Sequence, residues 1–407
     1  MQTNSPIIRF PGFKDSWNEQ RLGKFFTSSR AKGSDGIPTL SVTLNRGLIN
    51  RDEMDRKTET NLDADEHLLV REGDIAYNMM RMWQGAFGRS SCEGIVSPAY
   101  VVIRPLASAD SGYFEYAFRR ARSIYLFWAY SYGLTNDRLR LYGNDFLRIP
   151  FSAPSLPEQR KIADFLTVVD GRIQQLSQKK ALLQDYKKGV MQQLFTQAIR
   201  FKDDQGNDFP EWEEKKLGEV ITSLDAGISV NSDDSPATGK ELGILKTSCV
   251  TTGQFDPTEN KRVTAPDELG RLKEPVTAGT IVISRMNTKA LVGLSGLVPQ
   301  DHPNLFLPDR LWAAKIAKSC SAEWAAQLLR STRMRALISA KATGTSGSMK
   351  NITKGDVLSL PAELPCLPEQ TKIANFLTAL DRKIESVSHQ ITHTQTFKKG
   401  LLQQMFV

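Results

Sequence analysis

One segment of this sequence occurs twice. The stretch "LPEQRKIADFLTVVD" begins at Leu156, and "LPEQTKIANFLTALD" begins at Leu367. Aligning each residue with the one 211 positions later pairs residues 157–195 with 368–406 without a gap, and 19 of these 39 positions are identical. A period of roughly 200 residues is too long for a solenoid repeat. The duplication therefore predicts two homologous domains, each followed by the same long segment.

The repeat continues upstream of this segment, but its offset changes. Arg119 and Arg122 fall on Arg330 and Arg333 at the same offset, whereas "WNEQRLG" at Trp17 matches "WEEKKLG" with an offset of 195. The two halves therefore share a frame but differ in loop lengths. We expect a first domain at 1–153, a central helix at 154–199, a second domain at 200–364 and a final helix at 365–407.

The repeated segment has the heptad pattern of a coiled coil. The apolar seam consists of Ile162, Leu166, Val169, Ile173, Leu176, Leu183, Val190 and Leu194, and then of Ile373, Leu377, Leu380, Ile384, Val387, Ile391, Leu401 and Met405. Ser155 and Glu158 flank a proline, which predicts a capping box at the helix start. Lys180, Lys187 and Lys398 interrupt the seam, which tolerates them where it is open to solvent or to a partner protein.

A seam of this length must be covered, because an exposed apolar stripe promotes association. The two helices either pair with each other or each pairs with another molecule. Pairing within the chain is simpler. If the helices are antiparallel, the two domains lie at opposite ends of a rod and are related by a pseudo-two-fold axis.

The globular parts predict strand-rich α+β domains. Short β-type runs such as "GDIAY", "AYVVIRP", "GTIVISRM" and "LWAAKIA" alternate with glycine-marked turns. Each domain then has one helical pattern, "YFEYAFRRARSIYLFWAY" in the first and "AEWAAQLLRSTRMRALISA" in the second. The predicted fold is therefore two homologous α+β domains joined by a long antiparallel two-helix coiled coil.

Charge and cysteine usage constrain the function only weakly. The 53 basic and 45 acidic residues give a net charge of +8, which fits a polyanionic partner without requiring one. Residues 1–153 carry 20 basic and 17 acidic side chains, and residues 200–365 carry 21 of each, so nucleic-acid contacts must use local clusters. The four cysteines are widely spaced and the N-terminus lacks an apolar signal region. We therefore expect a cytoplasmic protein without a membrane span.

The sequence offers no catalytic motif. It lacks a Walker A loop, a G-x-G-x-x-G fingerprint, an amino-methyltransferase motif and a nuclease motif. His389 and His393 are four residues apart on a predicted helix and fit a metal site in spacing, but the first copy has Gln178 and Leu182 there. A solvated helix face is the better interpretation. We predict no catalytic residue and no metal in this chain.

The order domain, helix, domain, helix resembles a known family. Each helix begins with "LPEQ" and ends with "KKGVMQQLF" or "KKGLLQQMF", and the chain opens with "RFPGFKDSWNEQRLG". These features are similar to those of the DNA-specificity subunit of type I restriction-modification enzymes. The resemblance covers nearly the whole chain and is most specific in the two helices.

This resemblance implies a non-catalytic subunit that binds double-stranded DNA. Each globular part is then a target-recognition domain that reads one half of an asymmetric bipartite site, and the helices are a spacer that sets the gap. It further implies two methyltransferase subunits with adenine-N6 activity and two motor-nuclease subunits that restrict foreign DNA. The cofactors S-adenosylmethionine, ATP and magnesium are expected in those partner subunits, not in this chain.

Candidate DNA-reading residues are polar side chains in loop-like places, where arginine suits guanine and asparagine suits adenine. They are Asn78, Arg81, Arg138, Arg140, Lys246, Thr247, Arg285, Asn287, Lys350 and Asn351. Any one of them is equally compatible with a phosphate contact or a solvated surface. Arg119, Arg122, Arg330 and Arg333 recur between the halves, which favours a shared role in DNA-backbone contact or in structure.

Three other functions fit parts of the pattern. A standalone bipartite DNA-binding regulator would need no partner subunit, and an enzyme of unrecognised type would show activity alone. A structural coiled-coil adaptor would need no divergent domains. Two different domains on one preserved spacer favour different targets on a fixed frame, so the specificity subunit is the leading hypothesis.

Overall fold

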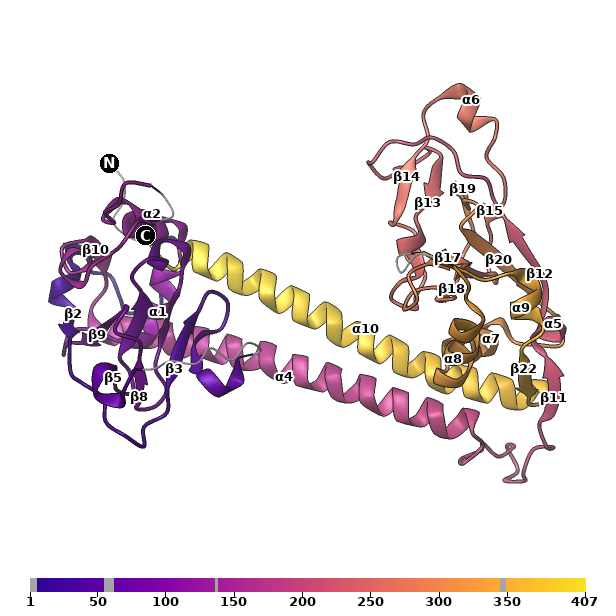
Figure 1. Ribbon diagram of the computed structural model, residues 1–407, viewed down its shortest axis with the longest axis horizontal. Coiled ribbons are helices and arrows are strands. Elements are labelled where there is room, and N and C mark those ends of the chain that lie inside the picture. Colours follow the sequence, from indigo (N-terminus) through magenta and orange to yellow (C-terminus); the bar gives the residue numbers. More distant parts are fainter. Residues whose placement is uncertain (1–5, 55–61, 136–137, 345–348) are drawn as a thin grey trace. The chain divides into compact units, whose positions relative to one another are not determined.

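The computed structural model describes residues 6–54, 62–135, 138–344 and 349–407 (Figure 1). It divides into two compact units, each of which contains part of both long helices. Unit 1 comprises Met1–Ser177 and His389–Val407, and unit 2 comprises Gln178–Ser388. The domain boundaries drawn from the sequence stay a prediction.

The two predicted long helices are α4 (Leu156–Phe195) and α10 (Leu367–Gln404). Every one of the sixteen seam residues is buried or half-buried. In unit 1 the first part of α4 contacts the last part of α10, and in unit 2 the last part of α4 contacts the first part of α10. The prediction of an antiparallel pair within one chain is therefore confirmed.

Unit 1 is built on a four-stranded antiparallel sheet in the order β2-β9-β6-β7. Smaller pairs are β1 with β10, β3 with β4 and β5 with β8. Its strands are β1 (Asn18–Arg21), β2 (Phe26–Ser29), β3 (Leu40–Thr43), β4 (Gly47–Asn50), β5 (Leu68–Val70), β6 (Ile75–Asn78), β7 (Phe87–Arg89), β8 (Gly94–Val96), β9 (Tyr100–Pro105) and β10 (Pro150–Ala153). Its short helices are α1 (Ser111–Phe118), α2 (Ala121–Ala129) and α3 (Gly143–Phe146), with 3-10 turns η1 (Leu22–Lys24), η2 (Arg51–Glu53), η3 (Ala64–Glu66) and η4 (Met82–Gln84).

Unit 2 repeats this sheet as β12-β20-β16-β18 and the terminal pair as β11 with β22. Its second sheet, β14-β13-β19-β15, corresponds to the pairs β3-β4 and β5-β8 of unit 1, which the parallel bridge Thr39–Ile95 joins. Unit 2 also has the short ribbon of β17 with β21. Its strands are β11 (Glu213–Lys216), β12 (Ile221–Ala226), β13 (Gly243–Leu245), β14 (Asn260–Arg262), β15 (Pro275–Val276), β16 (Ile281–Ser284), β17 (Met286–Asn287), β18 (Ser295–Leu297), β19 (His302–Phe306), β20 (Leu311–Ile316), β21 (Lys350–Asn351) and β22 (Pro361–Leu364). Its helices are α5 (Leu217–Val220), α6 (Pro266–Leu269), α7 (Ala322–Arg330), α8 (Thr332–Lys341) and α9 (Lys354–Leu358), with the 3-10 helix η6 (Thr247–Val250).

The repeat predicted from the sequence is thus a repeat of sheet topology. Strand β6 pairs Ile75 with Ile103 of β9, and β16 pairs Ile281 with Ala314 of β20. The β-type runs recognised in the sequence coincide with these central strands, and β6 and β16 are buried along nearly their whole length. The prediction of two homologous α+β domains is confirmed.

The single helical pattern predicted in each domain is wrong. The first pattern forms α1 and α2, and the second forms α7 and α8. In unit 2 the break falls at Ser331, whose Oγ accepts a hydrogen bond from Met334 N at the start of α8. In unit 1 it falls at Arg120, whose backbone is extended. A serine that caps a new helix ends the helix before it, because its side chain bonds to the backbone of the new first turn. The spacing of apolar residues does not reveal such a break.

Candidate nucleic-acid interface and spacer helices

In unit 1, four predicted DNA-reading residues come together where a strand end meets a hairpin. They are Asn78, Arg81, Arg138 and Arg140. The turn after β6 leads into η4, and the hairpin is closed by two backbone hydrogen bonds between Tyr132 and residue 140, of 3.0 and 2.9 Å. Leu141 N donates to Met79 O at 2.8 Å, which joins the hairpin to the turn. A Cβ at Gly133 would lie 2.5 Å from a carbonyl oxygen of the opposite arm, so this close hairpin requires glycine.

Most of these side chains in unit 1 face solvent. Arg81, Arg138 and Arg140 are exposed, and none of them forms an ion pair with a residue that the structure describes. Asn78 is half-buried, and its Oδ1 accepts a hydrogen bond from Met80 N at 2.9 Å. Its side-chain oxygen therefore already stabilises the turn. Of the neighbouring methionines, Met82 is fully buried, whereas Met80 is 40% exposed.

Unit 2 builds the same arrangement with different side chains. Ile352 N donates to Arg285 O at 3.1 Å, and Thr343 and Asn351 exchange backbone hydrogen bonds of 2.9 and 2.8 Å. The ribbon of β17 and β21 places Asn287 opposite Lys350. The predicted residues Arg285, Asn287, Lys350 and Asn351 thus lie together, although about 65 residues separate the two segments in sequence.

The basic side chains of this second cluster already have local partners. The Arg285 guanidinium lies over the ring of the core residue Trp312, 5.6 Å from its centroid. Lys350 Nζ donates to Gly344 O at 2.6 Å, and Asn287 Oδ1 accepts from Thr288 N at 2.9 Å. The two clusters therefore occupy equivalent places but present different chemistry.

Lys246 and Thr247 lie outside both clusters. Thr247 begins η6, which packs against β16 and β18. Lys246 Nζ is 3.1 Å from a carboxylate oxygen of Glu259, so its charge is partly compensated. The structure does not bring this predicted pair to the turn and ribbon of unit 2.

The recurring arginines have different contacts in the two units. Arg119 pairs with Glu115 at 3.3 Å and lies over the Phe87 ring, whereas Arg330 is 3.3 Å from Asp381 of α10. Arg333 Nη1 is 2.5 Å from Glu363. Arg122 is exposed. Arg330 and Arg333 therefore hold structural ion pairs, and a common role for all four residues stays a prediction.

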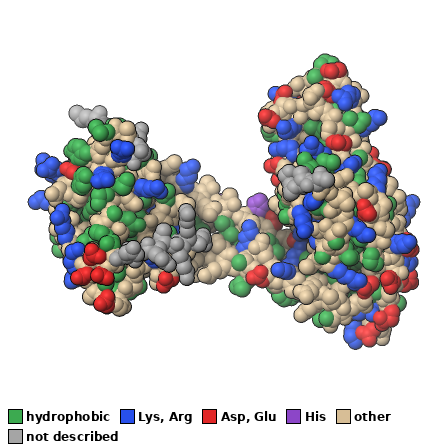
Figure 2. Space-filling model, in the orientation of Figure 1, with side chains coloured by type: hydrophobic (Ala, Val, Ile, Leu, Met, Phe, Trp, Pro, Cys, Tyr) green, Lys and Arg blue, Asp and Glu red, His purple; other side chains and the backbone are tan. Residues whose placement is uncertain are grey.

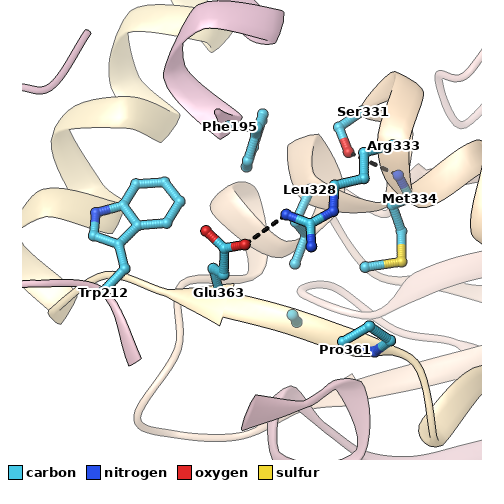
Figure 3. A pocket seen from close by; sticks show the side chains of 9 residues that line it. Phe195, Trp212, Leu328, Ser331, Arg333, Met334, Pro361 and Glu363 are labelled. Carbon is cyan, nitrogen blue, oxygen red and sulfur yellow. Dashed lines mark hydrogen bonds and ion pairs between the residues drawn. The ribbon is translucent and has the colours of Figure 1, made fainter. Parts of the chain in front are cut away.

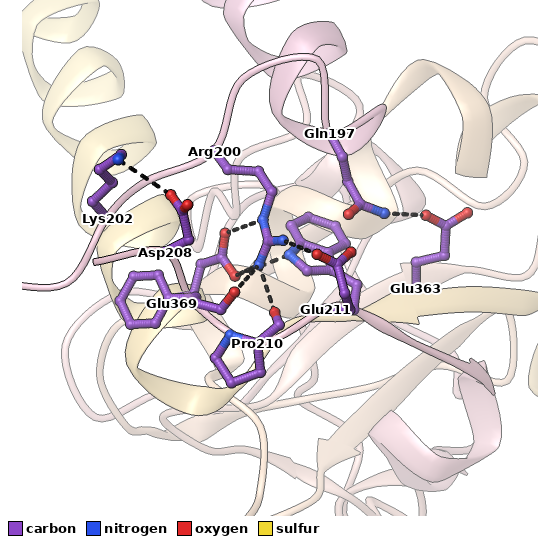
Figure 4. A network of polar contacts seen from close by, with 10 residues as sticks. Gln197, Arg200, Lys202, Asp208, Pro210, Glu211, Glu363 and Glu369 are labelled. Atoms are coloured by element: carbon purple, nitrogen blue, oxygen red, sulfur yellow. Dashed lines mark hydrogen bonds and ion pairs between the residues drawn. The ribbon is translucent and has the colours of Figure 1, made fainter. Parts of the chain in front are cut away.

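The repeated "LPEQ" glutamate anchors each long helix to its unit. Glu158 is 2% exposed and accepts hydrogen bonds of 2.8 and 2.7 Å from the guanidinium of Arg9. Glu369 is fully buried and accepts bonds of 3.2 and 3.0 Å from Arg200 and one of 2.9 Å from Trp212 Nε1 (Figure 4). The predicted capping role is corrected, because a carboxylate buried this deeply needs a charged donor.

The glutamine of the same motif holds the neighbouring short helix. Gln159 Oε1 accepts from Asp110 N at 2.9 Å, and Gln370 Oε1 accepts from Ser321 N at 2.9 Å. Asp110 and Ser321 are the N-cap residues of α1 and α7. Both glutamines are buried. The motif is therefore a structural joint between each long helix and its domain.

A repeated lysine–aspartate pair joins the two long helices inside each unit. Lys398 of α10 is 2.6 Å from Asp170 of α4 in unit 1, and Lys187 of α4 is 2.6 Å from Asp381 of α10 in unit 2. The offset of 211 relates both partners. Lys187 is buried, so the expectation that it faces solvent or a partner is corrected. A buried ammonium is tolerated here because a carboxylate pairs with it.

The Asp381 carboxylate predicts how unit 2 responds to acid. Burial alone would raise the pKa of Asp381, but Arg330 and Lys187 outweigh burial and hold it below the ordinary value of 3.8. The stabilising contribution is thus complete above that value and is lost as the pH falls through the lowered pKa. We expect urea midpoints of unit 2 to drop below pH 3.8, and Asp381→Asn to reduce this drop. An identical acid profile in the variant would contradict the assignment.

The far end of each long helix completes the core of a unit. In unit 2, Phe195 at the end of α4 lies near Trp212 and the Arg333–Glu363 pair (Figure 3). In unit 1, Phe406 stacks on Tyr113 with ring centroids 5.3 Å apart. The cavity shown in Figure 3 is about 20 Å³, which is room for roughly one water molecule.

One anchoring signal was present in the sequence but was missed. Arg9 and Phe10 recur as Arg200 and Phe201 with an offset of 191. Phe10 packs edge-on against Phe165 at 5.6 Å, and Phe201 packs in the same way against Phe376 at 5.8 Å. Searching the repeat for matched pairs at other offsets would have found this Arg-Phe pair.

The described residues show neither a metal cluster nor a membrane-spanning helix. Among them, no three His, Cys, Asp or Glu side chains gather in a way that could hold a metal ion. His389 and His393 are both exposed on α10. Within the same residues, none of the helices is both long and apolar enough to cross a bilayer.

Comparison with known proteins finds a family match in the second half of the chain. A family described as "Type I restriction modification DNA specificity domain" matches residues 210–393, which include the second anchoring motif and most of α10. This part of the chain, just under half of its length, is therefore similar to the type I DNA specificity domain. The sheet, the "LPEQ" motif and the lysine–aspartate pair of this matched region are repeated in the first half of the chain.

Relatives with this family name are similar over part of their length. The EcoKI specificity subunit of Escherichia coli strain K12 is 25% identical over 75% of this chain and 66% of its own. The EcoEI subunit of Escherichia coli is 27% identical over 45% of this chain and 31% of its own. The chain thus spans about a third to two thirds of the curated specificity subunits that it matches.

Solved structures of type I specificity subunits share the fold. The S subunit from M. genitalium is similar with a TM-score of 0.59 and 13% identity, over 99% of both chains. A chain from a structural study of assembly and conformational transition in a type I system has a TM-score of 0.53 and 17% identity, over 98% of this chain and 99% of its own.

Proposed function

We propose that this chain is the specificity subunit of a type I restriction-modification complex and that it reads an asymmetric bipartite DNA site. Each unit reads one half-site through its strand-end turn and adjoining hairpin or ribbon. The observation that carries the proposal is that the same site is built twice, with exposed arginines in unit 1 and an Asn287–Lys350 ribbon in unit 2. Side-chain differences at equivalent places would read different bases.

The paired helices are proposed to act as spacer and docking surface. The Lys–Asp pairs and the buried "LPEQ" joints support this, because they tie both helices to both units. In this proposal two methyltransferase subunits and two motor-nuclease subunits associate with the chain and carry the chemistry. S-adenosylmethionine then binds the methyltransferase, and ATP and magnesium bind the motor subunit.

Methylome sequencing of cells that express this chain with its methyltransferase partner tests the proposal. We expect one asymmetric bipartite motif with adenine methylation. A variant with seven residues inserted between Asp170 and Lys187, and seven between Asp381 and Lys398, keeps both Lys–Asp pairs and the heptad seam. Seven helical residues add roughly 10 Å, so the gap should grow by about 3 base pairs at 3.4 Å each while both half-sites persist.

Two outcomes would contradict the proposal. An unchanged gap in the inserted variant would refute the spacer role, even if the motif is bipartite. Tight, specific DNA binding by the purified chain without a methyltransferase would favour a standalone bipartite DNA-binding regulator. A single insertion in α4 alone serves as the control, because it shifts the seam against α10 and should abolish methylation.

A further inference from the structure

Unit 1 exposes a row of aromatic side chains on α2 and just beyond its end. Tyr125 is 61% exposed, Trp128 is 44% exposed and Tyr132 is 60% exposed. The rings of Tyr125 and Trp128 are 5.8 Å apart and tilted by 34°. We call these three residues the aromatic stripe. On the face shown in Figure 2, hydrophobic and basic side chains of unit 1 lie next to one another.

The aromatic stripe ends at the candidate DNA-reading cluster. Helix α2 packs against η4, whose N-cap residue is Arg81. Tyr132 and Arg140 exchange two backbone hydrogen bonds, so their side chains project from the same face of the hairpin. One end of the stripe, Tyr132, therefore lies beside Arg140 of the candidate DNA-reading cluster.

The equivalent surface of unit 2 has no such rings. The offset of 211 places Ala336, Ser339 and Thr343 where unit 1 has the aromatic stripe. That offset holds structurally here, because the bridges Tyr132–Arg140 and Thr343–Asn351 correspond to each other. The shared fold therefore does not require aromatic residues at these positions. Exposed rings that occur in unit 1 and not at the equivalent positions of unit 2 indicate a contact made by unit 1.

The charge around the stripe favours DNA as its occupant. Arg81, Arg138 and Arg140 have no ion-pair partner among the residues described here, so they suit a polyanion. Methyltransferases extrude the target base from the duplex, which opens the stack and costs free energy. Aromatic rings beside the reading residues can compensate by stacking on an unstacked base.

We propose that the aromatic stripe stacks on DNA bases that are exposed when the adenine of the half-site read by unit 1 is extruded. The proposal rests on the proposed function, and it assigns the stripe to opened DNA instead of to a protein partner. Unit 2 then extrudes its adenine without this help, so the two half-sites should differ in how strongly they depend on this chain for opening.

The test uses the complex of the full chain with its methyltransferase subunits and duplexes that contain the whole target. In each duplex one target adenine is mismatched, which opens the stack in advance. We expect Trp128→Ala to weaken binding about tenfold to one of the two duplexes, the one whose mismatch lies in the half-site read by unit 1. Binding to the other duplex should not change. The substitution should also slow methylation of the adenine in the half-site read by unit 1 alone, with an unchanged salt dependence of binding. Trp128→Phe should restore most of the affinity, because it keeps a ring.

Ser339→Ala, at the equivalent position of unit 2, is the matched control. It should change the affinity for neither of the two mismatched duplexes. Equal affinities of wild type and Trp128→Ala for both mismatched duplexes would overturn the proposal. So would a Trp128→Ala variant that assembles poorly with the methyltransferase in sedimentation but binds DNA normally once assembled, since the stripe would then be a protein-docking surface. If the wild-type complex itself shows no target-specific binding, the proposed function fails instead.

Discussion

Arg200→Ala is expected to destabilise unit 2 by about 3 kcal/mol, because it leaves the Glu369 carboxylate buried without its charged partner. Glu369 is fully buried and, among the residues that the structure describes, keeps only Trp212 Nε1 as a donor after the substitution. The loss should appear as a lower urea midpoint and as faster hydrogen exchange in the core around α7 and α10. Exchange resolved by segment is needed, because a chain with two units does not unfold in one step.

A surface ion pair in the same unit provides the control. Arg333 and Glu363 are 2.5 Å apart, but their side chains are 56% and 30% exposed. Arg333→Ala should therefore cost less than about 1 kcal/mol. In the double variant Arg200→Ala with Glu369→Gln, much of the loss should be recovered, because no charge remains buried. Equal effects of Arg200→Ala and Arg333→Ala would refute the anchoring role.

Lys187→Ala is expected to loosen the helix pair in unit 2 by about 3 kcal/mol. The Lys187 and Asp381 side chains are only 8% and 18% exposed. Within the described part of the chain, the remaining carboxylate would then have Arg330 as its one charged partner. The loss should appear as faster hydrogen exchange in the adjoining segments of α4 and α10 and as a lower thermal midpoint.

The duplicated chain supplies its own control for this substitution. Lys398→Ala removes the equivalent lysine in unit 1, where the side chains of Lys398 and Asp170 are 24% and 39% exposed. We expect a cost of about 1 kcal/mol or less there. A larger loss from Lys398→Ala than from Lys187→Ala would show that burial does not govern the strength of these pairs.

The contacts of the anchoring residues could not be read from the sequence. Glu158 fits a capping box because a serine precedes it at the right distance, yet its carboxylate binds Arg9, which lies 149 residues away in the chain. The spacing of residues along a helix start predicts hydrogen bonds between near neighbours, but it does not reveal a partner far away in the sequence. Likewise the seam pattern treated Lys187 as an interruption, since the aspartate that neutralises it lies on the other helix.

The candidate DNA-reading residues were predicted unevenly. Choosing polar residues in loop-like places identified two groups that the fold brings together, one in each unit. It also included Lys246, which lies at η6 beside Glu259. Residue type alone cannot distinguish the clustered residues from Lys246. Which distant segments come together depends on how the strands pack into a sheet. Whether any of these side chains contacts a base stays a prediction.

The sequence by itself determined the duplication, the two long helices and the α+β class, because these depend on periodicity and on a repeat within one chain. Only the tertiary structure decided what the repeated "LPEQ" does and which residues neutralise its glutamate. It also decided that the aromatic stripe is exposed on one unit and absent from the equivalent face of the other. These properties depend on burial and on partners far away in sequence, which a linear pattern does not encode.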